Sequence, residues 1–146
     1  MLAPNFYSLP ILGLTFRLMI SALAFVGTVP EILQAQEQGS EEDFAILKSA
    51  DLDAMLQKKD FVFVNVHVPY EGEIANTDVF IPYDKIADNL NKLPKDKAAK
   101  IVLYCRSGRM SEIAARALVQ LGYTRVAHLA GGMNDWKQSG YRIIEK

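Results

Sequence analysis

The chain has 146 residues, of which 50% are hydrophobic and 23% are charged, and its formal net charge is −1. This balance is typical of one globular domain and excludes a disordered chain. With one cysteine, two histidines and no basic face, the sequence excludes an internal disulfide and gives no reason to expect a metal, another cofactor or a nucleic-acid partner.

The first 35 residues differ in composition from the rest of the chain. Arg17 is the only charged side chain up to Pro30, and an apolar run of 12 residues, 18–29, follows it. This length, with a positive charge before it, is typical of a secretory signal peptide. We expect residues 1–35 to be a signal peptide cleaved before Gln36 or, if uncleaved, a membrane anchor, with an internal core helix as the third alternative. The protein is then exported to the periplasm or the cell surface.

Residues 36–43 are acidic and contain glycine and serine, which predicts a short linker before a domain at 44–146. Apolar runs in that domain predict strands, and segments of helical period predict helices between them. The strands are expected at 44–47, 61–66, 100–104 and 125–129, and the helices at 50–58, 83–93, 111–121 and 133–139.

Two local details complete this pattern. Ser49 is a candidate N-cap for the first helix, because a serine side chain can accept a hydrogen bond from the first turn. Residues 67–82 contain two prolines and a glycine, so we expect a surface loop with a brief strand at 79–81. Strands that alternate with helices predict an α/β domain with a parallel sheet.

The single cysteine, Cys105, lies between the predicted strand 100–104 and the predicted helix 111–121. Backbone N–H groups at such a turn, together with the positive end of the helix dipole, stabilise an anion held there. Arg106 and Arg109 add two positive charges within four residues. The pattern therefore favours a reactive thiolate over the alternative, a buried cysteine that only packs.

Three segments of the chain resemble the rhodanese-like sulfurtransferases: the loop Cys105–Ser111, the helix exit 120–126, and residues 129–136 with Gly140 and Tyr141 after them. The resemblance implies a three-layer α/β domain whose central, mostly parallel, five-stranded sheet is flanked by helices. It also implies that Cys105 accepts a sulfane sulfur as a persulfide and passes it to a nucleophile.

The candidate site consists of catalytic Cys105 and a substrate-binding group formed by the residues after it and one histidine. That group is Arg106, Ser107, Gly108, Arg109, Met110, Ser111 and His67. The N–H groups of the loop would hold the persulfide. His67 follows the predicted strand 61–66 on the side where ligands gather in open α/β sheets, and the alternative is that it only fixes the path of its loop.

Ser111 separates the chain from the cysteine phosphatases that share this fold. By family resemblance, those enzymes carry an arginine six positions after the cysteine to clamp a phosphate, and that position here is Ser111. A sulfur-centred donor is therefore favoured over a phosphate ester.

The loop after strand 61–66 departs from the family's pattern. Many relatives carry aspartate, any residue and arginine there, whereas residues 65–67 of this chain are Asn-Val-His. Glu71, Glu73 and Asp78 make the following segment negative, which would oppose small anions such as thiosulfate if the loop lies over the pocket. The alternative is a solvated loop surface.

We therefore predict a sulfurtransferase that moves a sulfane sulfur from a donor such as thiosulfate or a persulfide to a thiophilic acceptor through a Cys105 persulfide. The acceptor is expected to be a thiol or cyanide, or the cysteine of a partner protein, and no cofactor is required. The alternative is a non-catalytic rhodanese-like module that binds a partner or carries sulfur. Contact with a membrane is expected only through an uncleaved leader.

Overall fold

A computed structural model describes residues 43–145 of the chain. The predicted leader (1–35) and all but the last residue of the predicted linker (36–43) lie outside the described residues, as does residue 146. Within 43–145, no helix has the length and apolar character needed to cross a bilayer.

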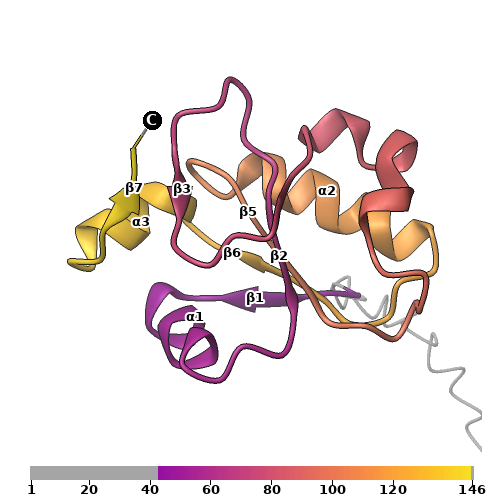
Figure 1. The fold of residues 1–146 in the computed structure, drawn as a ribbon, viewed down its shortest axis with the longest axis horizontal. Coiled ribbons are helices and arrows are strands. Elements are labelled where there is room, and N and C mark those ends of the chain that lie inside the picture. The colour runs from indigo at the N-terminus through magenta and orange to yellow at the C-terminus, as the bar shows by residue number, and fades with distance from the viewer. Residues whose placement is uncertain (1–42, 146) are drawn as a thin grey trace, which may run out of the picture. The chain divides into compact units, whose positions relative to one another are not determined.

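The central element is a five-stranded sheet with the strand order β1-β6-β5-β2-β4 (Figure 1). Its strands are β1 Ala45–Leu47, β2 Val62–Asn65, β4 Val79–Phe80, β5 Ile101–Tyr104 and β6 Val126–Leu129. All neighbouring strands run parallel. The predicted parallel five-stranded sheet is confirmed, and β5, which precedes Cys105, lies at its centre.

Helices cover both faces of this sheet, which makes three layers (Figure 1). One face carries α1 Ser49–Leu56 and α3 Gly132–Gln138, and the other carries α2 Arg109–Gln120 with the 3-10 helices η1 Tyr83–Lys85 and η2 Ala87–Lys92. Side chains of β5 alternate between the faces: Ile101 and Leu103 pack under α2, and Val102 and Tyr104 pack under α1 and α3. All four are buried, as expected of a central strand covered on both faces.

The N-terminus of α1 differs from the prediction. Lys48 is the N-cap and Ser49 is the first helical residue. The Ser49 hydroxyl donates a hydrogen bond of 2.5 Å to Oδ2 of Asp135 in α3. Its side chain therefore joins two helices instead of capping its own.

The single helix predicted at 83–93 is wrong, because two short 3-10 helices occupy that segment. Asn89 has φ −121° and ψ 26°, outside the helical region. Its side-chain Nδ2 donates a hydrogen bond of 2.9 Å to the carbonyl of Lys85. Asparagine competes with the backbone for hydrogen bonds in this way, which interrupts a regular helix.

The segment predicted as a loop, 67–82, contains two strands. One is β4, at the expected place, and the other is β3 Glu73–Ile74, which pairs antiparallel with β7 Ile143–Ile144. Neither β3 nor β7 was predicted, because two-residue strands are too short to show a hydrophobic period. This small second sheet fixes the middle of the loop to the end of the domain.

Candidate functional site

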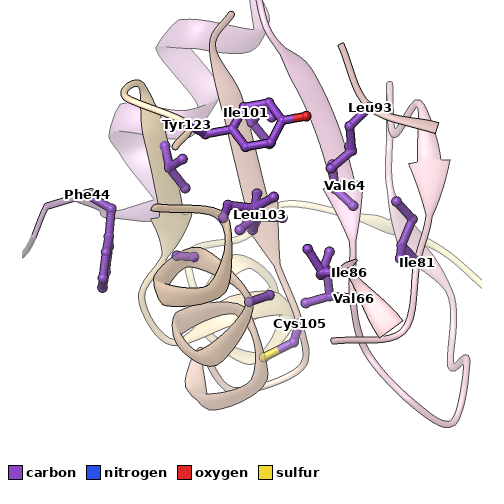
Figure 2. Packing of buried hydrophobic residues seen from close by; sticks show 14 residues of the cluster. Phe44, Val64, Val66, Ile81, Ile86, Leu93, Ile101, Leu103, Cys105 and Tyr123 are labelled. Carbon is purple, nitrogen blue, oxygen red and sulfur yellow. The ribbon is translucent and has the colours of Figure 1, made fainter. Parts of the chain in front are cut away.

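Cys105 directly follows β5, at the carboxyl edge of the parallel sheet. Figure 2 shows Ile101, Leu103 and Cys105 in one row, with the sulfur at its carboxyl end. Cys105 is only 1% exposed and belongs to the cluster packed under α2. It is therefore buried, as the packing alternative required, and it also lines a pocket, as a reactive thiol requires.

The turn after Cys105 brings a backbone donor to the sulfur. The N–H of Gly108, the N-cap of α2, donates a hydrogen bond of 3.1 Å to Sγ. Gly108 has φ +93°, and a Cβ there would lie 2.9 Å from the backbone nitrogen of Gly131. Glycine is thus required both for the left-handed conformation and for space. The hydrogen bond and the N-terminus of the 12-residue α2 stabilise negative charge on the sulfur.

Helix α3 holds the same turn from the opposite side. The carbonyl of Cys105 accepts a hydrogen bond from the N–H of Met133, and that of Arg106 accepts one from Asn134, both at 2.9 Å. Gly132 has φ +57°, and a Cβ there would lie 2.7 Å from the carbonyl carbon of Arg106. Because these carbonyl oxygens bond to α3, they are kept from facing an anionic sulfur.

The Cys105 pocket has a volume of about 370 Å³. Its lining residues are His67, Cys105, Arg106, Ser107, Arg109, Met110 and Asn134. The structure thus brings together most of the candidate site residues, although Gly108 and Ser111 do not line the pocket. Asn134 comes from α3 and was not predicted as a site residue, although it lies in the segment 129–136 that resembles the family.

Two further observations concern the choice of this pocket as the candidate site. A larger hollow, of about 550 Å³, lies near the start of β5 and β6, but neither cysteine nor histidine lines it. In the part of the chain that the structure describes, no three His, Cys, Asp or Glu side chains are grouped to hold a metal ion. The polar side chains that line the Cys105 pocket are a thiol, two guanidinium groups, an imidazole, a hydroxyl and an amide.

Ser111 is fully buried and serves the turn itself. Its hydroxyl donates a hydrogen bond of 2.9 Å to the carbonyl of Gly108 and lies 3.2 Å from Nδ1 of His128. The side chain therefore supports the residue whose N–H reaches the sulfur, and it does not enter the pocket.

His67 lies two residues after β2 and is positioned by Asn65. The buried Asn65 side chain accepts the N–H of His67 at 3.0 Å and donates to the carbonyl of Gly72 at 2.9 Å. The His67 side chain is 7% exposed and lines the Cys105 pocket. Neither ring nitrogen has a hydrogen-bond partner among residues 43–145. His67 therefore has unused hydrogen-bonding capacity at the pocket.

Glu71 lies between two of the pocket residues. Its Oε1 is 3.2 Å from Nη1 of Arg106, and its Oε2 is 3.3 Å from Nε2 of His67. The contact between Glu71 and His67 lacks hydrogen-bond geometry, so the ring nitrogens of His67 remain without a hydrogen bond although the carboxylate is close. With side chains 41% and 56% exposed, Glu71 and Arg106 form a solvated pair that adds less than about 1 kcal/mol to stability. The carboxylate also places a negative charge next to two residues that line the pocket, and this side of the pocket is called its mouth below.

The other two carboxylates of this segment have different partners. Oδ2 of Asp78 accepts hydrogen bonds from Nζ of Lys59 at 2.6 Å and from the N–H of Phe63 at 2.7 Å. Glu73 lies in β3 beside Tyr70, whose pKa is raised by burial and by the interaction with Glu73. Of the three carboxylates, Glu71 is the one with ion-pair contacts to pocket-lining residues in the described part of the chain.

Comparison with known proteins agrees with this geometry. The family model of the rhodanese-like domain matches residues 48–139. The chain is 34% identical over 116 residues to the tRNA uridine(34) hydroxylase of Erwinia tasmaniensis, and this match covers 75% of this chain and 32% of that protein. It is 35% identical over 89 residues to a sulfurtransferase of Allochromatium vinosum, and this match covers 59% of this chain and 80% of that protein.

Solved structures show the same fold. The rhodanese-related protein of Thermoplasma volcanium has a TM-score of 0.60 and 27% identity, and the match covers 70% of this chain and 99% of that one. The chain spans about a third of the length of the tRNA uridine(34) hydroxylases that it resembles. The similarity to those proteins therefore concerns this domain. Because the family model matches well over half of the sequence and includes Cys105 and α3, the chain belongs to the family of proteins with a rhodanese-like domain.

Proposed function

We propose that this domain is a sulfurtransferase in which Cys105 accepts a sulfane sulfur and passes it to an acceptor. The observation that carries the proposal is the sulfur's position, 3.1 Å from the N–H of Gly108 at the N-terminus of α2, beside a pocket lined by two arginines. The relative named as a sulfurtransferase supports the same class of reaction.

In the first half-reaction, the Cys105 thiolate attacks the outer sulfur of the donor. A sulfur–sulfur bond forms, and the bond between the donor's outer sulfur and its leaving group breaks. The bonding electron pair leaves with that group, which is sulfite when the donor is thiosulfate and a thiolate when it is a persulfide. The terminal sulfur of the new persulfide is anionic, and the loop N–H groups and the dipole of α2 stabilise it.

In the second half-reaction, the acceptor attacks the terminal sulfur and the Cys105 thiolate is released. With cyanide the product is thiocyanate, and with a thiolate it is a new persulfide. The two half-reactions share one enzyme intermediate, so the kinetics are ping-pong. In each step the attacking nucleophile supplies the electron pair of the new bond and the leaving group takes the pair of the broken bond, so neither step requires a redox cofactor. A volume of about 370 Å³ suits a small donor or the end of a side chain.

The test is sulfur transfer from thiosulfate or a small persulfide to cyanide, with the intact mass of the protein recorded before and after the donor is added. Wild type should turn over and gain the mass of one sulfur. Cys105→Ser should do neither, because a hydroxyl cannot carry a sulfane sulfur, while its thermal unfolding shows that it is folded. A wild type that gains no sulfur from either donor, or a serine variant that turns over, would overturn the proposal.

One observation favours a second candidate, a sulfur carrier that serves a specific partner protein. Glu71 pairs with Arg106 at the pocket mouth and so weakens the attraction of small anionic donors. If Cys105 accepts a sulfur from a persulfide but does not transfer it to cyanide or to small thiols, this candidate would be favoured. Turnover with both acceptors would favour the free-standing enzyme.

A further inference from the structure

We propose that Glu71 is a specificity-determining residue that makes the Cys105 pocket select against dianionic reagents in favour of those with little or no negative charge. As a statement about sulfur donors, this rests on the proposed sulfurtransferase function. As a statement about access to Cys105, it can be tested independently of that function.

The position of Glu71 is the first support. One carboxylate oxygen is 3.2 Å from Nη1 of Arg106 and the other is 3.3 Å from Nε2 of His67. Both partners line the Cys105 pocket. A negative charge therefore lies beside two groups that an anionic ligand would use.

The state of His67 is the second support. Its side chain is buried, it lines the pocket, and its two ring nitrogens have no hydrogen-bond partner within residues 43–145. A buried polar group without a partner costs free energy, so a ligand that bonds to His67 gains by relieving that cost. An anion that approaches Nε2 must also approach Oε2 of Glu71, whereas a neutral or cationic ligand meets no such repulsion.

The charge balance gives the direction and size of the effect. Glu71 offsets one of the two positive charges that Arg106 and Arg109 bring to the pocket. Repulsion scales with the ligand's charge, so a dianion is penalised twice as much as a monoanion and a cation is attracted. For a dianion several ångströms away in a water-like medium, removing the Glu71 charge should raise kcat/KM about five- to tenfold at low salt. The gain should largely vanish at about 1 M salt, where the Debye length is about 3 Å.

The test uses Glu71→Gln, which keeps the size of the side chain and removes its charge. Glu73→Gln is the matched control, because it removes the same charge two residues further along, from a carboxylate that interacts with Tyr70. Thiosulfate, a dianion, and cysteamine persulfide, a zwitterion without net charge because its ammonium offsets its anionic terminal sulfur, are compared as sulfur donors. Glu71→Gln should raise kcat/KM for thiosulfate about five- to tenfold, at low salt only, and should leave kcat/KM for cysteamine persulfide within about twofold of wild type.

A second readout does not depend on sulfur transfer. Iodoacetate and iodoacetamide both alkylate a thiolate with loss of iodide and have nearly the same size, but only iodoacetate is charged. Glu71→Gln should raise the ratio of their rates at Cys105 about two- to threefold in favour of iodoacetate. A shifted ratio in a protein that transfers no sulfur would support the charge selection and refute the proposed function.

Two results would overturn the inference about Glu71. One is a ratio of alkylation rates that Glu71→Gln leaves unchanged. The other is an equal change in Glu73→Gln, because the effect would then come from net charge and not from the position of Glu71 at the pocket mouth.

Discussion

Replacement of Gly132 by alanine should separate α3 from the turn that holds Cys105. A Cβ on Gly132 would overlap the carbonyl oxygen of Cys105 and lie 2.7 Å from the carbonyl carbon of Arg106. These are backbone atoms, which cannot rotate out of the way. The turn and the helix must therefore move apart by roughly 1 Å to restore a normal contact distance.

The energetic cost follows from the contacts that this movement breaks. The N–H groups of Met133 and Asn134 donate hydrogen bonds of 2.9 Å to the carbonyls of Cys105 and Arg106. A buried polar group left without its partner costs about 1–3 kcal/mol. With two such bonds strained or lost, Gly132→Ala should lower the free energy of unfolding by about 3–5 kcal/mol, a large share of the roughly 5–15 kcal/mol of a typical domain.

Gly122→Ala is the matched control. Gly122 has φ +89°, and a Cβ there would meet nothing within 4 Å, so this variant measures backbone strain alone. That strain costs about 1–2 kcal/mol. Gly132, with φ +57°, lies closer to the ordinary left-handed region. Strain alone would thus make Gly132→Ala the milder substitution, whereas the close approach to the Cys105 turn reverses the order.

Urea unfolding of wild type and both variants gives the free energies. The rate at which iodoacetamide alkylates Cys105 under native conditions reports the geometry of the turn. We expect a substantially changed alkylation rate in Gly132→Ala and a rate close to that of wild type in Gly122→Ala. If Gly132→Ala cost no more stability than Gly122→Ala, the reasoning that α3 is docked on the Cys105 turn through Gly132 would be wrong.

Two further variants test buried polar groups at the carboxyl ends of β5 and β2. The Tyr104 hydroxyl accepts the N–H of Ile74 at 3.0 Å, so Tyr104→Phe should cost about 1–3 kcal/mol. Burial raises the pKa of Tyr104 above its ordinary 10.0, so the stability that the neutral Tyr104 hydroxyl contributes is complete below pH 10 and is lost as the pH rises further. If the difference in unfolding free energy between wild type and Tyr104→Phe stayed constant from about pH 9 to 11, the argument would be contradicted. Asn65 donates to Gly72 and accepts from His67, and Asn65→Asp removes the donor, so we expect a loss of about 2–4 kcal/mol at neutral pH. The loss should be smaller near pH 4, where a protonated aspartate can donate again, and unfolding curves that show equal losses at both values would exclude this explanation.

The sequence predicted the elements whose signal is local. β2, β5 and β6 lie inside the predicted strand ranges, because a continuous apolar run of that length fits a strand buried on both faces. Cys105 was correctly placed at the turn from a strand into a helix. The start of α2 was predicted two residues late, because the prediction followed the apolar spacing, whereas the helix begins after Gly108, an N-cap in the left-handed conformation.

The features that the sequence did not predict depend on contacts between distant segments. Asn134 lines the pocket because α3 docks on the Cys105 turn, and the segment 129–136, although it resembles the family, does not by itself show that contact. The roles of the carboxylates between Glu71 and Asp78 likewise depend on contacts with distant segments. Glu71 and Asp78 look equivalent in the sequence, yet Asp78 is bound by Lys59 and by the backbone of β2, and Glu71 alone of the two contacts pocket residues.

The position of Glu71 depends on the end of the domain, which links charge selection to sulfur geometry. The adjacent Gly72 has φ +121°, and a Cβ there would lie 2.6 Å from the carbonyl oxygen of Ile144, so only glycine lets the loop approach β7. β7 in turn follows α3, and Nε1 of Trp136 in α3 donates a hydrogen bond of 3.0 Å to the carbonyl of Arg142, directly before β7. The helix that fixes the carbonyls of the Cys105 turn therefore also fixes the strand against which the Glu71 loop is held. A change in the docking of α3 should alter the sulfur site and the charge at its mouth together.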